Sequence, residues 1–472
     1  MSTVPRPSET RASGHAVGPR RISAVGTDRA LLRAQVSFRQ AVGRAVVVWV
    51  AAYLALRLSA RADLAALQAA LTAVLWAAIG HRVAQASRAM RFAVGDFAVS
   101  AMTATVGVVT LSVIGFWISS VGIDRWSLLL IAASTFAGAG IWDFAVQRVA
   151  RAPRRVLLVG GGASTARLLA DLALDPDSGL EVVGIVDDAV DDSIDVSVPY
   201  CGPLKTLPAV VRRLSPDLVV VAVPTGRPEV FEQLLGVADA GFQMVGLPEI
   251  YEFAFGRLPV EDLTSAWFMS VLHAYNQPAN RLAKRMFDVV VAVLGLAATA
   301  LILPAIVIVV KSSRGPLFYK QQRLGENGRP FKILKFRSMR TDAEAAGLAQ
   351  WAATNDPRVI WGGLLLRRLR IDELPQLWNV LRGEMSIVGP RPERPEFIEH
   401  LQAGVPFWTH RHLLKPGITG WAQIRAGYAA DALGTVEKLS YDLWYLRHRS
   451  LVLDVMICLK TFPRMAMLRG SR

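Results

Sequence analysis

Residues 154–165 read Arg-Arg-Val-Leu-Leu-Val-Gly-Gly-Gly-Ala-Ser-Thr, and the fold of the middle of the chain follows from them. The run Val156–Val159 is typical of a buried β-strand, and three glycines separate it from a helical pattern over Ala166–Leu174. Two further β-branched runs follow, Glu181–Val186 and Leu218–Val223. Strand, glycine turn, helix and strand in this order predict a Rossmann-like α/β domain with a parallel sheet over residues 151–265.

The glycine-rich turn has features of a dinucleotide-binding site. Backbone amides at such a turn can hold a pyrophosphate, and a carboxylate after the next strand can hold a ribose. Gly160, Gly162 and Asp187 are therefore candidate contacts for NAD or another nucleotide. Thr165 stands where a third glycine would be, and a turn in a domain that binds nothing, or that has a regulatory role, explains the pattern equally well. No tyrosine in the chain is followed four residues later by a lysine, which argues against redox chemistry of the short-chain reductase type.

Upstream of this domain the chain is apolar. Residues 1–40 are rich in Arg, Ser, Pro and Gly and predict a disordered basic tail. Residues 41–150 contain four apolar stretches, each near the ~20 residues that cross a bilayer. They are Ala41–Leu58, Leu64–Ile79, Phe97–Ser119 and Trp126–Val146. We expect an integral membrane bundle of four transmembrane helices; four buried helices of a soluble domain are the alternative.

The basic residues around these stretches predict their orientation. The N-terminal tail, the second connection (His81–Arg91) and the exit of the fourth stretch (Arg148–Arg155) are rich in arginine, whereas the third connection carries only Asp124 and Arg125. By the positive-inside rule, both soluble ends lie in the cytoplasm. The pattern predicts a multi-pass protein of the cytoplasmic membrane.

The composition narrows the class of partner. Of the 472 residues, 52% are hydrophobic and 19% are charged, and the formal net charge is +15. Such a charge suits an anionic membrane face or phosphorylated substrates. Nucleic acid is disfavoured, because the apolar residues form long runs rather than lying behind a basic surface. The two cysteines, Cys201 and Cys458, are far apart in sequence, which excludes a disulfide framework.

Downstream, residues 367–383 predict a helix that follows a charged turn. Apolar residues recur at helical spacing, Pro375 fits the first turn, and Gly383 fits the position just past the end. Asp372 is therefore expected at or beside the N-cap, with Glu373 next to it, where free amides would keep both carboxylates ionised. An ionised carboxylate is what attack on phosphorus or Mg²⁺ coordination requires. Helix capping alone is the alternative, and the arginines just upstream favour a phosphate site.

Three other segments place basic residues on extended or stiff backbone. Phe331–Met339 alternates apolar residues with lysine and arginine, so a strand there can present cations to phosphates or to a membrane face. Proline and glycine clusters around Arg391 and Lys415 fix a basic residue on a stiff loop, which suits a phosphate or nucleotide contact. Ordinary surface turns are the alternative for these two clusters.

Together these residues resemble the bacterial sugar transferase family, the polyprenyl-phosphate hexose-1-phosphate transferases, from Lys284 to Thr461. The matching motifs are Lys284-Arg285 with Asp288, Gly315-Pro316 with Gln322, Arg323 and Gly325, Lys335–Met339, Asp356-Pro357-Arg358, Asp372–Gln376, Pro390-Arg391-Pro392 and Lys415–Gly420. The apolar and nucleotide-fold segments upstream resemble the longer members of that family, which start capsule or exopolysaccharide repeat units.

The resemblance implies an activity and a set of site residues. A hexose 1-phosphate would move from a UDP-sugar to a polyprenyl phosphate of the undecaprenyl type, with release of UMP and a covalent aspartyl intermediate at Asp372. Glu373 would assist, through a Mg²⁺ held by both carboxylates or by handling the acceptor's proton. The residues expected to bind substrate or phosphate are Arg323, Lys335, Arg337, Arg367, Pro390, Arg391, Pro392 and Lys415. The lipid bilayer is the remaining partner. The sequence leaves open which sugar is moved and whether the chain forms a homodimer.

The resemblance also implies how the last part of the chain folds. We expect a monotopic α/β phosphoglycosyl transferase domain over residues 281–472, on the inner face of a bacterial cytoplasmic membrane. Its re-entrant helix at 285–312 would be broken by a proline and return to the same leaflet. Pro304 supplies the break, about one turn later than is usual and after Leu303.

Two other functions are less consistent with the residues. A membrane-bound nucleotide-sugar dehydratase would share the four spans and the glycine turn, but the Tyr/Lys pair that it requires is missing. An inactive membrane scaffold of the same family is the non-enzymatic alternative, and the intact Asp372, Glu373 and Arg367 argue against it.

Overall fold

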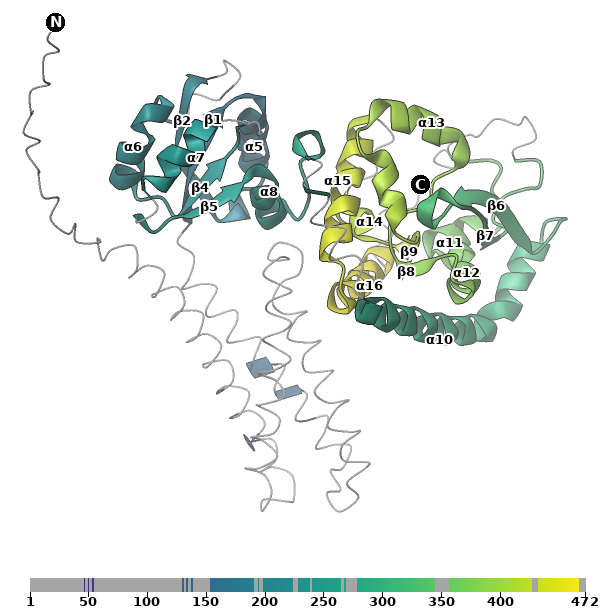
Figure 1. Cartoon of the computed structure of the whole chain (residues 1–472). Coiled ribbons are helices and arrows are strands. Elements are labelled where there is room, and N and C mark those ends of the chain that lie inside the picture. The colour runs from purple at the N-terminus through teal and green to yellow at the C-terminus, as the bar shows by residue number, and fades with distance from the viewer. Residues whose placement is uncertain are drawn as a thin grey trace, which may run out of the picture.

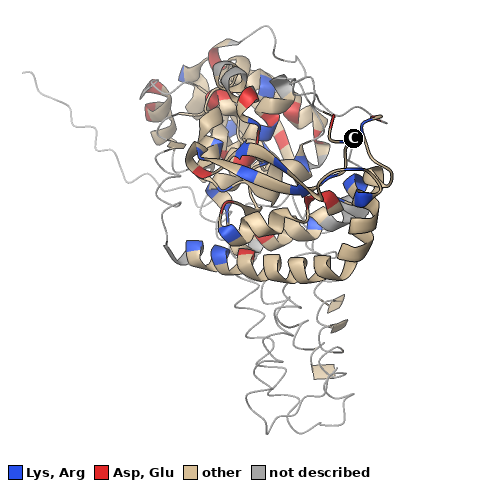
Figure 2. Cartoon of the chain, turned by 90° about the vertical axis from the view of Figure 1, so that its right-hand side faces the viewer, with Lys and Arg blue, Asp and Glu red and all other residues tan. Residues whose placement is uncertain are grey.

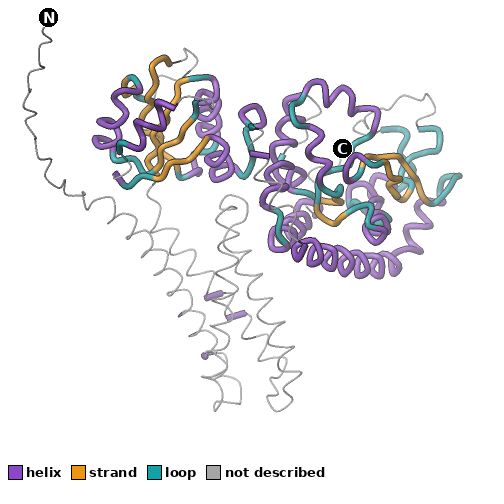
Figure 3. Tube along the Cα trace, in the orientation of Figure 1, coloured by secondary structure: helices purple, strands orange, loops and turns teal. Residues whose placement is uncertain are grey.

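The computed structural model describes two α/β domains, which lie side by side in Figures 1 and 3. The described residues are 153–190, 194, 198–223, 228–237, 240–264, 267–268, 278–343, 356–426 and 432–466, with isolated helical positions between 46 and 138. The expected basic tail and, apart from those isolated positions, the four expected membrane spans lie outside the described residues.

The first domain is a five-stranded parallel sheet with helices on both faces (Figure 3). Its elements are β1 Arg154–Gly161, α5 Ala163–Leu174, η2 Pro176–Ser178, β2 Leu180–Val190, β3 Tyr200–Gly202, η3 Leu204–Thr206, α6 Leu207–Leu214, β4 Leu218–Val221, α7 Pro228–Leu235, β5 Gln243–Gly246 and α8 Leu247–Phe255. The strand order β3-β2-β1-β4-β5 reverses its direction of growth between β1 and β4, as a doubly wound fold does. The prediction of a Rossmann-like domain is confirmed.

The central strand explains why helices cover both faces. The four side chains of Val156–Val159 are at most 1% exposed. Val156 and Leu158 pack with residues of α5 and α8, whereas Leu157 and Val159 pack with residues of α6 and α7. A strand that is apolar on both sides needs cover on both sides, so a continuous apolar run is typical of a parallel sheet.

The C-terminal domain is mostly helical and contains two small sheets (Figure 1). Its elements are α10 Pro278–Lys311, β6 Phe318–Leu324, η6 Glu326–Gly328, β7 Pro330–Phe336, α11 Gly363–Arg368, η7 Ile371–Glu373, α12 Gln376–Arg382, β8 Ser386–Val388, α13 Pro395–Gly404, η8 Trp408–Leu413, β9 Gly417–Thr419, α14 Trp421–Arg425, α15 Ala432–His448 and α16 Leu451–Ala466. Strands β6 and β7 form an antiparallel hairpin, and β8 and β9 form a parallel pair.

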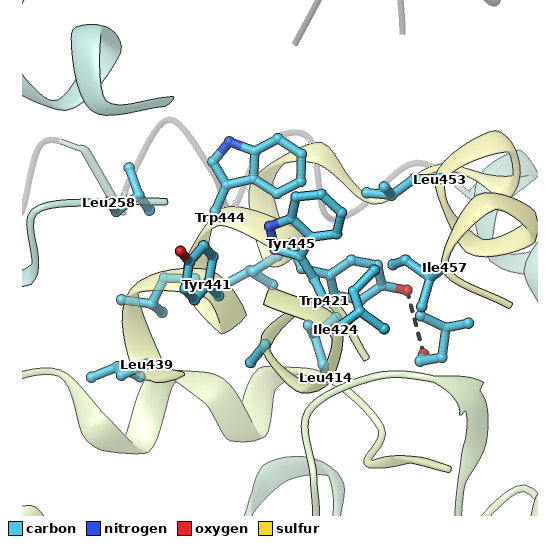
Figure 4. Packing of buried hydrophobic residues seen from close by; sticks show 14 of the residues in the cluster. Leu258, Leu414, Trp421, Ile424, Leu439, Tyr441, Trp444, Tyr445, Leu453 and Ile457 are labelled. Atoms are coloured by element: carbon cyan, nitrogen blue, oxygen red, sulfur yellow. Dashed lines mark hydrogen bonds between the residues drawn. The ribbon is translucent and has the colours of Figure 1, made fainter. Parts of the chain in front are cut away.

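The core of this domain is built around two stacked indole rings (Figure 4). Trp421 of α14 and Trp444 of α15 lie 4.8 Å apart between ring centroids, and each is at most 1% exposed. Leu258, which precedes the 3-10 turn η5 (Val260–Asp262), is buried in the same core. The segment from Leu258 onward therefore packs with the C-terminal domain, although the sequence-based boundary was expected near residue 265.

The two domains contact each other through the C-terminal end of α8. The Trp421 indole donates to the Gly256 carbonyl over 2.8 Å, and Arg425 donates to the Phe255 carbonyl over 3.2 Å. Arg447 of α15 pairs with Glu252 of α8 at 2.8 Å. Carbonyls at the end of a helix lack partners within the helix, so these donors satisfy them and join the domains.

Among the described elements, helix α10 has the most exposed large hydrophobic side chains. Within it, Arg281–Lys311 is long and apolar enough to cross a membrane, and only 17% of its apolar 18-residue stretch is buried. Basic residues mark its N-terminal part in Figure 2, and the following stretch is almost uncharged. Pro304 lies inside α10 without ending it, and the helix bends near its C-terminal end toward β6 in Figure 1. A re-entrant path through one leaflet stays a prediction.

Candidate active site

The two expected catalytic carboxylates lie in a 3-10 turn between two short helices. Helix α11 ends at Arg368; Arg370, in a left-handed backbone conformation (φ 54°), then precedes η7, which carries Asp372 and Glu373. Helix α12 begins only at Gln376, with Pro375 as its N-cap residue. The prediction that Asp372 lies at or beside the N-cap of this helix is therefore wrong: Asp372 stands three residues before the N-cap, because the i→i+3 bonds of η7 close a separate turn first. The predicted end at Gly383, with φ 82°, is confirmed.

Glu373 is surrounded by positive charge. Its carboxylate oxygens lie 2.9 Å from Lys335 Nζ, 3.2 Å from Arg370 Nη1 and 3.5 Å from Arg391 Nη2. Burial by itself would raise the pKa of Glu373, but Lys335, Arg391 and Arg370 outweigh burial and hold that pKa well below its usual range. Glu373 is therefore a permanent anion that fixes three cations from three segments of the chain.

Asp372 has the opposite environment. Its side chain is 8% exposed, and it makes no hydrogen bond or ion pair with another side chain of the described residues. Burial first, and then the charge of Glu373, raise the pKa of Asp372 to about 6, against the opposing charges of Lys335, Arg367 and Arg370. The helix end was expected to keep both carboxylates ionised; at Asp372 the pKa is nevertheless raised, because burial outweighs the nearby cations. A carboxylate with a pKa near 6 is still mostly ionised at pH 7, and its oxygens are free to attack.

A small open pocket lies beside this turn. It is lined by Arg323, Ile333, Lys335, Glu373, Gln376, Arg391, Pro392 and Gly417. Arg323 reaches it from β6, where Nη1 donates to the Pro392 carbonyl over 3.1 Å and Nη2 to Gln321 over 2.7 Å. Burial and the neighbouring Arg391 lower the pKa of Arg323 to about 10, so it remains a cation at neutral pH. Three cations therefore line the pocket with Glu373 as the single carboxylate, an arrangement that suits a phosphorylated ligand.

The structure brings some of the expected phosphate-binding residues together and separates others. Arg323, Lys335, Arg391 and Pro392 line the pocket. Arg367, on α11, lies close enough for its charge to lower the pKa of Asp372. Pro390 is buried and does not line the pocket; its carbonyl accepts the Gly417 amide over 2.8 Å. Lys415 does not line the pocket. Its Nζ lies instead beside Gly383, at the end of α12, 3.7 Å from where a Cβ atom on that glycine would be.

Arg337 is a structural residue, and the prediction that it lines the site is wrong. Its side chain is buried, with Nε donating to the Pro316 carbonyl over 2.8 Å. Nη2 donates to the carbonyls of Val310 and Ser313 over 3.0 and 2.8 Å. The strand β7 ends at Phe336, so side-chain alternation no longer places Arg337 on the face of Lys335. Arg337 instead fixes the end of α10 to the chain that follows it.

Two residues of the site were not among the expected site residues: Arg370, which was counted only among the upstream arginines that favour a phosphate site, and Gln376. Arg370 binds Glu373, and Gln376 lines the pocket while being 3% exposed. The spacing of Arg370, three residues before Glu373, could have indicated this ion pair, because residues three apart are neighbours on a helical turn. Gln376 had no such signal, because a glutamine in the first turn of a helix is ordinary.

The residues fit a divalent cation only in part. Mg²⁺ prefers several oxygen ligands, and the described residues contain no group of three His, Cys, Asp or Glu side chains placed to hold a metal. Glu373 already pairs with three cations, so the expectation that it also binds Mg²⁺ does not fit its contacts. Asp372 can supply one carboxylate, which suits an ion held mainly by substrate phosphates and water.

The glycine turn of the first domain is closed by contacts within the chain. Gly160 has φ 120°, and the Gly161 amide donates to the Asp187 carboxylate over 2.7 Å. Thr165 is fully buried and donates to the Gly160 carbonyl over 2.7 Å, so it holds the start of α5 to the glycine turn. Gly162 is the N-cap residue of α5. Nucleotide binding at this turn stays a prediction.

The first turns of α5 also bind two carboxylates of η5 (Val260–Asp262), in the segment that links the two domains and is called the linker below. Arg167 pairs with Glu261 at 2.7 Å and with Asp262 at 3.0 Å, and Ser164 donates to Asp262. The linker thus supplies the negative charge that a phosphate would bring to this helix end.

Comparisons with known proteins agree with the geometry. Residues 279–468 match the family model described as bacterial sugar transferase. The UDP-glucose:undecaprenyl-phosphate glucose-1-phosphate transferase of Escherichia coli (strain K12) is 35% identical over 315 residues, which cover 65% of this chain and 67% of that protein. The exopolysaccharide production protein ExoY of Sinorhizobium fredii is 35% identical over 44% of this chain and 96% of its own length.

A third relative matches over a shorter part of its length. The UDP-N-acetylgalactosamine-undecaprenyl-phosphate N-acetylgalactosaminephosphotransferase of Aeromonas hydrophila is 40% identical over 227 residues, 48% of this chain. The match spans about half, 53%, of that relative.

Proposed function

Because this chain belongs to the bacterial sugar transferase family, we propose that it transfers a sugar 1-phosphate from a UDP-sugar to a polyprenyl phosphate. The observation that carries the proposal is the contrast between two adjacent side chains. Asp372 is buried and has no side-chain partner among the residues that the structure describes, whereas Glu373 holds three cations beside a pocket. Asp372 is suited to attack a phosphorus atom, and Glu373 is suited to holding in place the cations that stabilise the charge of that reaction.

The proposed reaction has two displacements at one phosphorus atom. A carboxylate oxygen of Asp372 attacks the sugar-linked phosphorus of the UDP-sugar. The bond from that phosphorus to the bridging oxygen breaks, and UMP leaves with the electron pair. An oxygen of the polyprenyl phosphate then attacks the same phosphorus and expels Asp372, which gives the polyprenyl diphosphate sugar and the free carboxylate. A covalent intermediate divides one difficult displacement into two easier ones.

The cations of the pocket stabilise the charge on the diphosphate. Lys335 and Arg391 reach the pocket from β7 and from the Pro390–Pro392 loop, and Glu373 holds both in place. Cations held in position before substrate arrives need little reorganisation during the reaction. A Mg²⁺ bound with the substrate, with Asp372 as its protein ligand, would neutralise further phosphate charge. We assign Glu373 to positioning the cations rather than to metal binding.

An apolar surface beside the site supports a lipid-linked acceptor and a membrane-bound location. Helix α10 packs closely on α12, where a Cβ atom on Gly295 would lie 2.7 Å from Leu377. Trp361, next to α11, and Trp378 of α12 are 74% and 48% exposed. Exposed tryptophans beside a long apolar helix are typical of the membrane interface. We propose that α10 enters the bilayer and that the polyprenyl phosphate approaches Asp372 from this side.

The decisive experiment incubates the full chain, in native membranes, with a panel of radiolabelled UDP-sugars and polyprenyl phosphate. We expect label in the extracted lipid for at least one sugar, and a labelled protein when the acceptor is omitted. Asp372→Asn should abolish both signals, a loss of roughly four orders of magnitude or more in rate, since the nucleophile is removed.

The matched control is Asp342→Asn, the same change at an exposed carboxylate that pairs with Arg340. It should retain full transfer. Turnover by Asp372→Asn at a rate near that of the control would remove Asp372 from the role of nucleophile. Absence of lipid labelling for every sugar with the unmodified chain would contradict the proposed function itself.

A further inference from the structure

The loop that carries Arg391 has no helix or strand of its own between Pro390 and Arg394. Other parts of the domain hold its backbone instead. The carbonyls of four consecutive residues accept one hydrogen bond each: Pro390 from the Gly417 amide (2.8 Å), Arg391 from Arg411 (3.2 Å), Pro392 from Arg323 (3.1 Å) and Glu393 from the Leu324 amide (3.2 Å). The direction of the Arg391 side chain therefore depends on these donors.

One of these donors, Arg411, is itself buried and bound to a buried acid. Arg411 lies in η8 and is 4% exposed, and its Nη2 lies 2.7 Å from Asp442 Oδ2 of α15. Asp442 is 1% exposed. The Trp408 ring covers the guanidinium at 4.4 Å, and Nη1 lies 3.6 Å from Glu393. Burying an ion pair is costly, so such a pair in a domain core calls for a reason beyond stability.

Arg411 does not line the pocket, whereas Arg391 does. The side chain of Arg391 is 47% exposed and extends to Glu373. We propose that Arg411, oriented by Asp442, is a positioning residue that fixes the Arg391 carbonyl and thereby directs the Arg391 guanidinium at the substrate diphosphate. The proposal rests on the proposed function and adds two residues that never touch the substrate.

The test uses a neutral pair of similar size, Arg411→Met with Asp442→Leu, which leaves neither charge buried alone. We expect kcat/KM for the UDP-sugar to fall roughly ten- to hundredfold through KM, as loss of a positioned group does, while KM for the polyprenyl phosphate is unchanged. Arg391→Ala should produce a loss of the same kind. The triple variant should lose no more than Arg391→Ala, because Arg411 acts only through Arg391.

The matched control replaces a second ion pair on the same helix α15, Arg447→Met with Glu252→Leu, which joins the domains away from the pocket. Its kcat/KM should stay near that of the unmodified chain. Losses that add fully in the triple variant, or an equal loss in the control pair, would overturn the proposal.

Hydrogen exchange gives a readout that does not depend on activity. The amides of Gly417 and Leu324, which donate to the loop carbonyls of Pro390 and Glu393, should exchange faster in the Arg411/Asp442 pair variant and at the original rate in the control pair. Unchanged exchange at these amides would overturn the positioning role even if transfer is slowed. An unmodified chain that transfers no sugar from the UDP-sugar panel would contradict the proposed function instead, and the two failures are thus distinguishable.

Discussion

The chain contains two regions whose sequences suit phosphate binding, and their charges are organised in opposite ways. At the glycine turn of the first domain, Arg167 is matched by Glu261 and Asp262 of the same chain. At the turn of the second domain, four cations surround Glu373 and the pocket, and Asp372 has no side-chain partner among the described residues. The first region already carries more negative than positive charge, whereas the second retains positive charge for a ligand.

The difference shows that a phosphate-binding pattern is not sufficient to predict a phosphate site. A helix N-terminus and glycines supply amides wherever they occur, but the free energy of binding an anion depends on which anion must be displaced. At the glycine turn, Glu261 and Asp262 of the linker already bind Arg167, so a phosphate would have to compete with them. At the second site, Glu373 holds the cations in place, and two of them, Lys335 and Arg391, also line the pocket.

The largest loss of activity among these tests should come from removing one cation of the second site. Lys335→Met should lower kcat/KM for the UDP-sugar about 10²- to 10³-fold, because a charge directed at the reacting phosphate is lost. The measurement is the initial rate of UMP release. Lys332→Met is the control, since Lys332 lies on the same strand but is exposed and does not line the pocket. Similar losses in both variants would show that the strand, rather than the position of the charge, is important.

Replacing Arg337 should separate stability from chemistry. Arg337→Met leaves several buried carbonyls without donors, so we expect a loss of about 2–4 kcal/mol in the free energy of unfolding. A thermal melt of the detergent-solubilised protein should show a midpoint lower by several degrees, while KM of the folded fraction is retained. A normal melting point together with a large increase in KM would show that Arg337 binds substrate and is not a structural residue.

The pH dependence of the first half-reaction tests the environment of Asp372. Attack requires the ionised form, and the pKa of Asp372 is raised to about 6, so the rate of UMP release without acceptor should fall about tenfold per pH unit below pH 6. Glu373→Gln removes a negative neighbour and releases Lys335 and Arg370, so both effects lower the pKa of Asp372. The acid limb should therefore move to lower pH in that variant, and a shift to higher pH would contradict the assigned electrostatics.

The smallest effect should come from the first domain. Arg167→Ala removes the ion pairs to Glu261 and Asp262 at the exposed end of α5. Exposed pairs contribute little, so transfer by the C-terminal domain should stay within about twofold of the unmodified rate. The assay is the same UMP release. A change of tenfold or more would show that the glycine turn communicates with the catalytic turn through the linker.

Some features follow from local sequence alone. The run Val156–Val159 with its glycine turn predicts a parallel α/β domain, because a strand that is apolar on both faces needs helices on both. Gly383 ends α12 as predicted, since few other residues adopt its left-handed conformation without strain. Asp372, Glu373, Lys335 and Arg391 were selected by residue type and motif, and the structure brings them to one site.

Other features depend on contacts between distant segments, which local patterns do not specify. Lys335 and Arg337 are two residues apart on one segment, yet one binds Glu373 and the other binds carbonyls at the end of α10. Asp372 and Glu373 are adjacent, yet one pKa is raised and the other lowered. Lys335, Arg370 and Arg391 contact Glu373 directly, whereas burial and the charge of Glu373 outweigh the more distant cations at Asp372. Residue type and local pattern thus determined which groups were available. The tertiary structure decided which charges met, because burial and distance set the strength of each electrostatic interaction.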